Sequence, residues 1–369
     1  KQPSHTSNMP SVTHSHFNVE TEGLEVAKAF ADGIRGKTVI VTGGNRSGIG
    51  FATARSFASQ SPAHLILAGR TPSKLQECID ALKAEFPGVD YRALRIDLAS
   101  QKSVRAAAAE VLGWADIPTI DIIVNTAGVM AIQEQTITDD GVEMHFATNH
   151  IGHFLFFCLV SPKLIKAAEG KPKGATRVVN VSSMSPSVTN MRWSDMNFEK
   201  KSKDLPEDEI PNIEFLELWG YEDVENMTYI PVEAYGQSKV ANVLFSIGAN
   251  RRLLEKHGIL SVSVHPGLID TEIARDFPAE RFADVKEMVK KGVFTYKSLG
   301  AGAATSLVAA LDPALAIGVG ESRDGKENYG TFLADCQITD IARPGSVSSA
   351  NAEKLWKLSE ELVKEEFSW

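Results

Sequence analysis

The stretch Val39-Ile-Val-Thr-Gly-Gly-Asn-Arg-Ser-Gly-Ile-Gly50 predicts a buried strand, a glycine-rich turn and a helix that begins near Ile49. Glycines permit a tight turn and let the backbone approach a pyrophosphate, and the free N–H groups at the start of a helix attract its charge. A plain strand-to-helix turn is the alternative, but the strand and helix on either side favour a dinucleotide site. We predict cofactor contacts from six residues of this turn: Gly43, Asn45, Arg46, Ser47, Gly48 and Ile49.

Short apolar runs, rich in β-branched residues, alternate with helical stretches along the chain. Strands without polar alternation, separated by helices, imply a parallel sheet that is covered on both faces and connected by right-handed crossovers. The predicted strands are Thr38–Val41, Leu65–Leu67, Tyr91–Ile96, Ile120–Val124, Val178–Val181 and Leu260–Val264. We therefore predict an α/β fold with a doubly wound, Rossmann-type parallel sheet.

The domain organisation is predicted to be simple. Residues 24–369 form a single domain, because no internal repeat or low-complexity linker divides them. Residues 1–23 are predicted to be a disordered leader, since the start of the chain is polar and lacks the apolar stretch of a secretory signal. Two long segments, 184–230 and 270–298, interrupt the alternation of strands and helices. Loops of this length usually have a function, so we expect these insertions to wall a substrate pocket, with plain decoration as the alternative.

The composition argues against several classes of function. The chain has 369 residues and a net charge of −9, whereas a nucleic-acid partner would require clustered Lys and Arg. Its longest apolar run, at 154–160, is far shorter than the ~20 residues that a membrane helix needs, so we expect no membrane span and a cytoplasmic protein. The three cysteines, Cys78, Cys158 and Cys336, fit no metal-binding spacing. They predict reduced thiols, and we expect no metal site.

The second predicted strand ends in Leu67-Ala-Gly-Arg70, where a site for NAD would have an acidic residue that bonds the ribose. A guanidinium can instead hold the 2′-phosphate of NADP in a bidentate manner, with Arg46 as a second positive group. We therefore predict NADP(H), against the alternative of a surface arginine. Asp97 and Leu98 follow the third strand, where the carboxylate could accept from the adenine or, alternatively, cap the next helix together with Ser100.

Two further turns are predicted to contact the cofactor. Asn125-Thr-Ala-Gly128 directly follows the fourth strand, and its small residues would let the cofactor lie against the backbone. His265-Pro-Gly-Leu-Ile-Asp-Thr271 leaves the sixth strand and could fold over the nicotinamide, with Thr271 bonding its carboxamide. The predicted contacts in these two turns are Asn125, Ala127, Gly128, Pro266, Gly267, Ile269 and Thr271.

Four residues are candidates for catalysis. Tyr235 and Lys239 are four residues apart, so on a helix they project from the same face. A phenol titrates near ~10 and an adjacent ammonium lowers that value, so Tyr235 could act as a general acid or base; a partly buried tyrosine with a solvated lysine is the alternative. Ser183 closes the fifth strand, at the edge where ligands bind in open α/β folds. Asn149 lies inside a predicted helix although asparagine is a poor helix former, which suggests that its side chain has a specific role there.

This ordered set resembles the short-chain dehydrogenase/reductase family from Gly36 to Leu311. The family's glycine turn is similar to Thr42–Gly50. The residues that match its catalytic Asn, Ser, Tyr and Lys are Asn149, Ser183, Tyr235 and Lys239, and the last two would also contact the cofactor. The phrases Asn149–Phe154 and Tyr235–Asn242 are most similar to the retinol dehydrogenase-like branch and its many fungal relatives, and we expect a role in fungal secondary metabolism.

The resemblance implies an NADPH-dependent oxidoreductase that passes hydride to a carbonyl, or from a secondary alcohol, of a small molecule. Tyr235 would donate the proton, Ser183 would orient the oxygen, Lys239 would hold the ribose and lower the tyrosine pKa, and Asn149 would support a relay water. Aromatic residues in the insertion 184–230 suggest a bulky, apolar substrate. An epimerase, a double-bond reductase or a non-catalytic NADP-binding protein is the alternative.

The sequence departs from the family's pattern in three places. The glycine turn has one residue more than usual, so either Gly43 or Gly44 could take the family's role. Asn125-Thr126 replaces the commoner Asn-Asn. The stretch between Ser183 and Tyr235 is longer than in most members and is similar to that of the carbonyl reductases, in which an insertion obstructs the usual dimer surface. Both a monomer and a homodimer therefore stay open.

Overall fold

One sheet of eight strands forms the centre of the computed structural model, which describes residues 9–278, 283, 286–287, 289–292 and 295–369. The strand order is β3-β2-β1-β4-β5-β6-β7-β8. Their bounds are β1 (Thr38–Thr42), β2 (His64–Gly69), β3 (Asp90–Arg95), β4 (Ile122–Asn125), β5 (Thr176–Val181), β6 (Ile259–His265), β7 (Phe332–Ala334) and β8 (Gln337–Ile338). The strands from β3 to β7 pair in parallel and β8 is antiparallel to β7. The direction of winding reverses between β1 and β4, which creates a switch point where ligands bind in such sheets.

The six predicted strands are all present, with ends shifted by a few residues at most, and the α/β prediction is confirmed. The short edge strands β7 and β8 were not predicted. They have three and two residues, too few for a run of apolar residues to stand out from the sequence around them.

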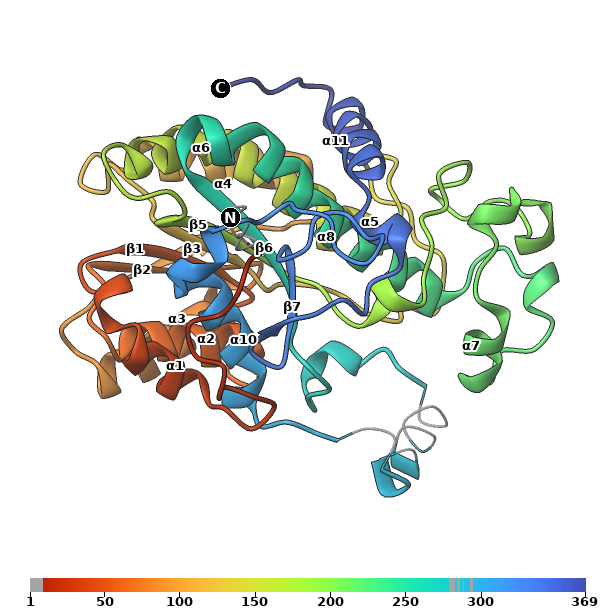
Figure 1. Cartoon of the computed structure of the whole chain (residues 1–369), viewed down its shortest axis with the longest axis horizontal. Helices are drawn as coiled ribbons and strands as arrows, with labels where there is room; N and C mark the ends of the chain where they lie inside the picture. The colour runs from red at the N-terminus through yellow and green to blue at the C-terminus, as the bar shows by residue number, and fades with distance from the viewer. Residues whose placement is uncertain (1–8, 279–282, 284–285, 288, 293–294) are drawn as a thin grey trace, which may run out of the picture.

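Helices cover both faces of the sheet (Figure 1). One layer holds α1 (Gly23–Ala29), α2 (Ile49–Ala58), α3 (Pro72–Glu85) and α10 (Leu299–Leu311). The other holds α4 (Gln101–Gly113), α6 (Gly152–Ala168) and α8 (Pro231–His257), and α11 (Ser349–Val363) packs on α8. Each layer buries its own cluster of apolar side chains against the sheet. The carboxyl ends of the strands, where the site lies, are therefore held between two packed cores.

Shorter helical segments connect these elements. They are η1 (Ala31–Gly33), α5 (Met144–Phe146), the π-helix η2 (Ala147–Ile151), η3 (Ser185–Ser187), η4 (Ser202–Asp204), η5 (Glu207–Glu209), α7 (Ile213–Leu218), η6 (Val224–Asn226), η7 (Glu272–Ala274), η8 (Pro313–Ala316) and η9 (Pro344–Val347). Five of them, from η3 to η6, lie in the first predicted insertion.

The N-terminal segment is not a disordered leader over residues 9–23, and that part of the prediction is wrong. Phe17 is buried at 3% exposure, and Thr13 donates its N–H and hydroxyl to the carboxylate of Asp312, at 2.7 and 2.5 Å. Gln337 donates to the carbonyls of His14 and Phe17. These partners lie about 300 residues away in the chain, so the sequence pattern gave no sign of them. Residues 1–8 lie outside the described residues.

Insertion 184–230 extends to one side of the sheet and carries α7 (Figure 1). It has a small apolar core of its own, built from Leu216, Val224 and Ile230. The aromatic ring of Trp219 meets that of Phe277 edge-on, with 5.7 Å between the ring centres. The two predicted insertions are therefore in contact, although residues 279–282, 284–285, 288 and 293–294 of the second one lie outside the described residues.

The helical run Met144–Ala168 is long and apolar enough to cross a membrane, although 72% of its most apolar window is buried inside the protein. Its aromatic side chains pack on α8 and α11: Phe154 meets Trp356 with 5.0 Å between ring centres, and Phe157 meets Phe245 at 5.3 Å. The apolar character of this run is thus used in the core beside the sheet.

Candidate active site

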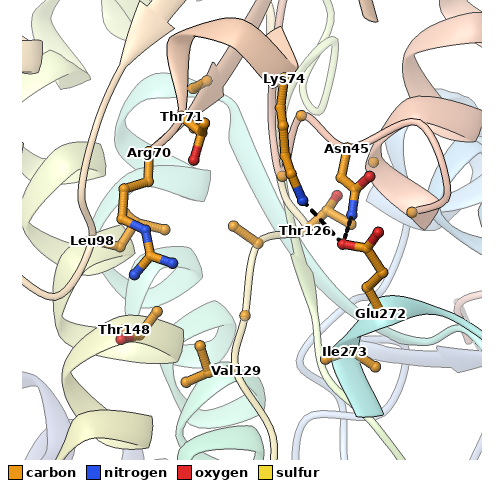
Figure 2. A pocket seen from close by; sticks show the side chains of 18 of the residues that line it. Asn45, Arg70, Thr71, Lys74, Leu98, Thr126, Val129, Thr148, Glu272 and Ile273 are labelled. Atoms are coloured by element: carbon orange, nitrogen blue, oxygen red, sulfur yellow. Dashed lines mark hydrogen bonds and ion pairs between the residues drawn. The ribbon is translucent and has the colours of Figure 1, made fainter. Parts of the chain in front are cut away.

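A cleft opens at the carboxyl ends of β1 to β4, on the side where the winding reverses (Figure 2). Of the predicted cofactor contacts, those that line it are Gly43, Asn45, Gly48, Ile49, Arg70, Asp97, Leu98, Ala127, Gly128 and Thr271. Lining residues that were not predicted include Thr71, Lys74, Thr126, Val129, Thr148, Glu272, Ile273 and Arg275. The cleft runs from the glycine turn to the segment that follows β6.

The glycines of the turn are required because other backbone atoms lie close to them. Gly43 has a φ of +92°, and a Cβ there would lie 3.3 Å from the backbone of Ala127. A Cβ on Gly50 would lie 2.4 Å from the carbonyl oxygen of Gly43. Gly43 therefore takes the family's role of turn glycine, because Gly44 does not have a positive φ and its Cβ would meet only the Leu75 side chain. The extra residue of the turn is accommodated after Gly43.

The cleft offers hydrogen-bond donors that suit a dinucleotide. Helix α2 begins at Ile49, so its first N–H groups have no partner within the helix and point toward the cleft with the positive end of the helix dipole. The hydroxyl of Thr126 lines the same cleft and is buried without a protein partner in the part of the chain that the structure describes. An unpaired buried hydroxyl is costly, so a ligand that bonds it is favoured. These features fit the binding of a phosphorylated dinucleotide.

Two cations stand at the end of β2. Arg70 directs its guanidinium into the cleft toward Thr148 (Figure 2) and forms no ion pair with any residue that the structure describes. Lys74 lies one helical turn farther along, near the start of α3. The sequence did not predict Lys74 as a cofactor contact. It lines the cleft because the start of α3 lies beside the end of β2.

Asp97 has features of both roles that the sequence left open, a contact to the adenine and a cap of the next helix. Its carboxylate accepts from the N–H of Ala99 at 3.1 Å, while the side chain of Ser100 caps α4 by accepting from the N–H of Ser103. Asp97 therefore shapes the turn, and it also lines the cleft together with Leu98. The carboxylate keeps a second oxygen available to a donor in the cleft.

Other predicted contacts lie outside the cleft lining. The guanidinium of Arg46 stacks on the ring of Phe51, 4.7 Å from its centre. Asn125 donates to Asn180 across the sheet at 2.8 Å. Three residues of the turn after β6, Pro266, Gly267 and Ile269, are likewise absent from the described lining. Gly267 adopts a φ of +93°, so it serves the turn itself.

A chain of hydrogen bonds joins Thr42, at the end of β1, to Asn149 in η2. The hydroxyl of Thr42 accepts from the N–H groups of Thr126 and Ala127, at 2.9 and 3.0 Å. Its own proton is therefore directed to Nε2 of His153, 2.9 Å away. The imidazole then carries its proton on Nδ1 and donates to the carbonyl oxygen of Asn149 at 3.1 Å. Burial lowers the pKa of His153 to about 4, which keeps this ring neutral.

Asn149 lies in the π-helix η2, which explains its place in the middle of a helical run. Single π-turns inside α-helices frequently occur at functional sites. The side chain accepts from the N–H of Val129 at 2.8 Å and donates to the carbonyl of Val129 and the hydroxyl of Ser238, at 2.9 and 2.8 Å. A Cβ on Gly128 would lie 3.0 Å from its Oδ1. The asparagine thus fixes the turn after β4 against α8.

Tyr235 and Lys239 share one face of α8, as predicted. The ammonium of Lys239 lies 5.6 Å from the centre of the Tyr235 ring and donates to the carbonyl of Val181 at 2.9 Å. Burial lowers the pKa of Lys239 to about 8. Burial also raises the pKa of Tyr235 to about 12, against a hydrogen bond with Ser183 that lowers it. The expected lowering of the tyrosine pKa is therefore wrong for the protein alone, since loss of water outweighs the neighbouring groups.

Ser183 is the serine that faces the tyrosine. Its hydroxyl donates to Ser185 at 2.8 Å and accepts from the N–H of the same residue at 3.0 Å. The neighbouring Ser182 instead donates to the carbonyl of Lys239 within α8 and is buried. The structure therefore brings Ser183, Tyr235, Lys239 and Asn149 together beside the turn that follows β4.

The segment after that turn is held by residues from two sides. Ala131 has a φ of +54° although it is not glycine, and it is buried. The next residue, Ile132, donates its N–H to Nε2 of His145 at 3.2 Å and accepts from the hydroxyl of Tyr229 at 2.8 Å. His145 is oriented by Glu143, at 2.7 Å from Nδ1. Tyr229 belongs to the first insertion, which therefore fixes the backbone at Ile132. The ring of His145, which Ile132 contacts, has its centre 6.4 Å from that of Tyr235.

Comparison with known proteins decides the family. The family profile described as short chain dehydrogenase matches residues 37–195. The oxidoreductase fscI of Fusarium equiseti is 36% identical over 251 residues, which cover 68% of this chain and 94% of that protein. The chain belongs to the short-chain dehydrogenase/reductase family.

Further similarities agree with the branch that the sequence indicated. Retinol dehydrogenase 12 of Mus musculus is 30% identical to this short-chain dehydrogenase/reductase over 350 residues, which cover 92% of each protein. A solved structure of a putative uncharacterized protein from Mycobacterium paratuberculosis superposes with a TM-score of 0.60 at 26% identity, covering 91% of this chain and 96% of that one. The prediction of the family and its branch is confirmed. Members of the family are oxidoreductases that bind nicotinamide cofactors.

The bond from Tyr229 to Ile132 can be tested by removing one hydroxyl. We expect Tyr229→Phe to raise KM for a carbonyl substrate by about 3- to 10-fold, because one net hydrogen bond to the segment is lost, while NADPH affinity stays unchanged. Tyr91→Phe is the matched control, since that hydroxyl also donates to a backbone carbonyl, Phe86 at 2.8 Å, but away from the cleft. Steady-state kinetics of both variants check this; equal KM values for Tyr229→Phe and the wild type would contradict it.

Proposed function

We propose that this protein is an NADPH-dependent reductase that acts on a carbonyl group of a small, apolar molecule. The observation that supports it most strongly is the convergence of Ser183, Tyr235, Lys239 and Asn149 beside Gly128. Gly128 lines the same cleft as Arg70. A bound dinucleotide would supply the hydride. The cleft has the unpaired N–H groups of α2 and the unpaired guanidinium of Arg70, among the described residues, that would bind the phosphates of such a molecule.

The protein's own groups would handle the proton and the oxygen. The phenol of Tyr235 gives its proton to the carbonyl oxygen, so that the substrate becomes an alcohol and the tyrosine a phenolate. The hydroxyl of Ser183, hydrogen-bonded to that phenol, orients the same oxygen. The ammonium of Lys239, 5.6 Å from the ring centre, stabilises the negative charge that the tyrosine acquires. Asn149 holds the backbone turn on which the reacting groups meet.

Tyr235 is protonated in the protein without a ligand, which suits the role of proton donor. Burial raises the pKa of this phenol to about 12, so the group is protonated at neutral pH and acts as a proton donor. Oxidation of an alcohol would need the phenolate as a base. The reverse reaction with NADP⁺ therefore requires the charge of Lys239 and of the bound cofactor to offset this burial.

Two cations support a preference for NADPH over NADH. Arg70 and Lys74 line the end of the cleft next to β2, where the adenosine ribose of a dinucleotide lies in this type of fold. No acidic residue occupies the end of β2 to bond a free 2′-hydroxyl. A fork of guanidinium donors suits a phosphate better than a hydroxyl.

The apolar character of the substrate is inferred from the insertions. Trp219 and Phe277 meet where the two insertions touch. Tyr229 bonds Ile132, which also bonds His145, and the centre of the His145 ring lies 6.4 Å from that of Tyr235. A second candidate function, binding of NADP without turnover, is disfavoured because such a protein would not need Ser183 and Tyr235 together. An epimerase or a double-bond reductase would use the same scaffold. The monomeric or homodimeric state, the cytoplasmic location and the role in fungal secondary metabolism stay predictions.

The role of the tyrosine is tested by Tyr235→Phe. We expect turnover to fall by at least about 100-fold, the range that loss of a general acid produces, while NADPH binding changes little because the ring remains. A screen of aromatic and aliphatic ketones with NADPH, followed at 340 nm, provides the activity. Turnover that survives in the variant would contradict the assignment.

The role of Arg70 is tested by Arg70→Ala. We expect NADPH affinity to fall about 10-fold or more and NADH affinity to change by less than about twofold, because a charge-assisted bond to phosphate is worth ~1.5–3 kcal/mol. Titration of nicotinamide fluorescence with each cofactor measures both values. Equal losses for the two cofactors would show that Arg70 does not read the 2′-phosphate.

A further inference from the structure

A carboxylate bridges the two rims of the cofactor cleft. Glu272, at the start of η7, accepts from Nδ2 of Asn45 at 2.6 Å, from the hydroxyl of Ser47 at 3.3 Å and from the ammonium of Lys74 at 3.1 Å. Figure 2 shows the Asn45 and Lys74 side chains converging on it from one side, while Glu272 reaches them from the other. Hydrogen bonds to Lys74 and Asn45 lower the pKa of Glu272 below its ordinary value, so the carboxylate is ionised at neutral pH.

The bridge joins three segments that are far apart in the chain. Asn45 and Ser47 belong to the glycine turn, Lys74 to the first turn of α3, and Glu272 to η7 at the start of the second insertion. Residues on both sides of Glu272, Thr271 and Ile273, line the cleft. The contact therefore lies across the opening through which an elongated ligand in the cleft would pass.

The donors that Glu272 uses are not the donors that a pyrophosphate would use. All three are side-chain groups on the rim, whereas the N–H groups of Ile49 and Gly50 at the start of α2 remain available on the floor. A phosphate on α2 and the carboxylate on the rim can thus be bound at the same time. The bridge can close above a bound dinucleotide instead of taking its place.

Free carboxylates in a cleft that receives a polyanion normally oppose binding. Glu272 has its charge offset by Lys74, with two neutral donors completing its contacts, so the repulsion is reduced where the bridge is formed. Opening the bridge leaves an unpaired carboxylate and an unpaired ammonium on the rim. The closed arrangement thus lowers the charge that a phosphate would meet at the rim.

We infer that Glu272 is a clasp for the nicotinamide cofactor, which ties the segment after β6 to the glycine turn and α3 and slows cofactor release. This inference rests on the proposed function, because it requires NADPH to bind in the cleft. It assigns to Lys74 a part in cofactor retention that is separate from recognition of the 2′-phosphate. Glu272 lies near the start of the second insertion, so opening of the clasp would release η7 from the glycine turn and α3.

Stopped-flow displacement measures the clasp without any substrate. The protein is loaded with NADPH and mixed with excess NADP⁺, and the loss of NADPH fluorescence gives the rate of release. We expect Glu272→Gln to release NADPH about 3- to 10-fold faster, the range for loss of an exposed ion pair with its hydrogen bonds. Association should slow by less than twofold or become faster.

Glu85→Gln is the matched control. Glu85 also forms an exposed ion pair, with Arg55, and it joins α2 to α3, yet it does not line the cleft. Its release rate should equal that of the wild type. An unchanged release rate in Glu272→Gln would overturn the clasp and leave the proposed function intact.

Two further outcomes separate the alternatives. Tighter NADPH binding in Glu272→Gln, with faster association and an unchanged release rate, would show that the carboxylate competes with phosphate, and the clasp would be wrong. No fluorescence change when the wild type is mixed with NADPH would overturn the proposed function, and the clasp with it.

Discussion

The hydroxyl of Thr42 holds together the turn after β4, which lines the cofactor cleft, and the helix that carries Asn149. It accepts hydrogen bonds from two backbone N–H groups of the turn after β4 and donates a hydrogen bond to His153, which in turn donates to the carbonyl of Asn149. The floor of the cofactor cleft and the helix that carries Asn149 are therefore tied to a single oxygen at the end of β1. Because the oxygen and both imidazole nitrogens are committed, the directions of these bonds are fixed. The ring must be neutral for this, and its burial keeps it so.

Further contacts connect Thr42 to the candidate catalytic residues on one side and to the cofactor cleft on the other. Toward the substrate, Asn149 fixes Val129, and the first insertion then fixes Ile132 through Tyr229. Toward the cofactor, the small residues of the glycine turn bring β1 close to Ala127, and Glu272 spans the rim above. The insertions thus do more than surround the site, because each supplies a side chain that holds a segment from outside the insertions in place. Backbone strain at Ala131 is maintained by these contacts.

The sequence predicted those parts of the molecule whose signal is local. The strand, turn and helix around Gly43, and the spacing of Tyr235 and Lys239, depend on residues that are close in the chain, and the structure has them. Lys74, Glu272 and Thr126 were missed because they reach the cleft only when three separate segments fold together. The tyrosine pKa was predicted in the wrong direction because spacing reveals the neighbouring ammonium but not the loss of water around the phenol. The N-terminal segment was misread because its partners, Asp312 and Gln337, are near the other end of the chain.

The orientation of the cofactor is the central claim, and a crystal structure of the protein with NADPH tests it most directly. The account predicts the 2′-phosphate within hydrogen-bond distance of Arg70, the pyrophosphate at the N–H groups of Ile49 and Gly50, and the nicotinamide beside Tyr235 and Lys239. A dinucleotide bound in the opposite direction, or outside the cleft, would contradict it.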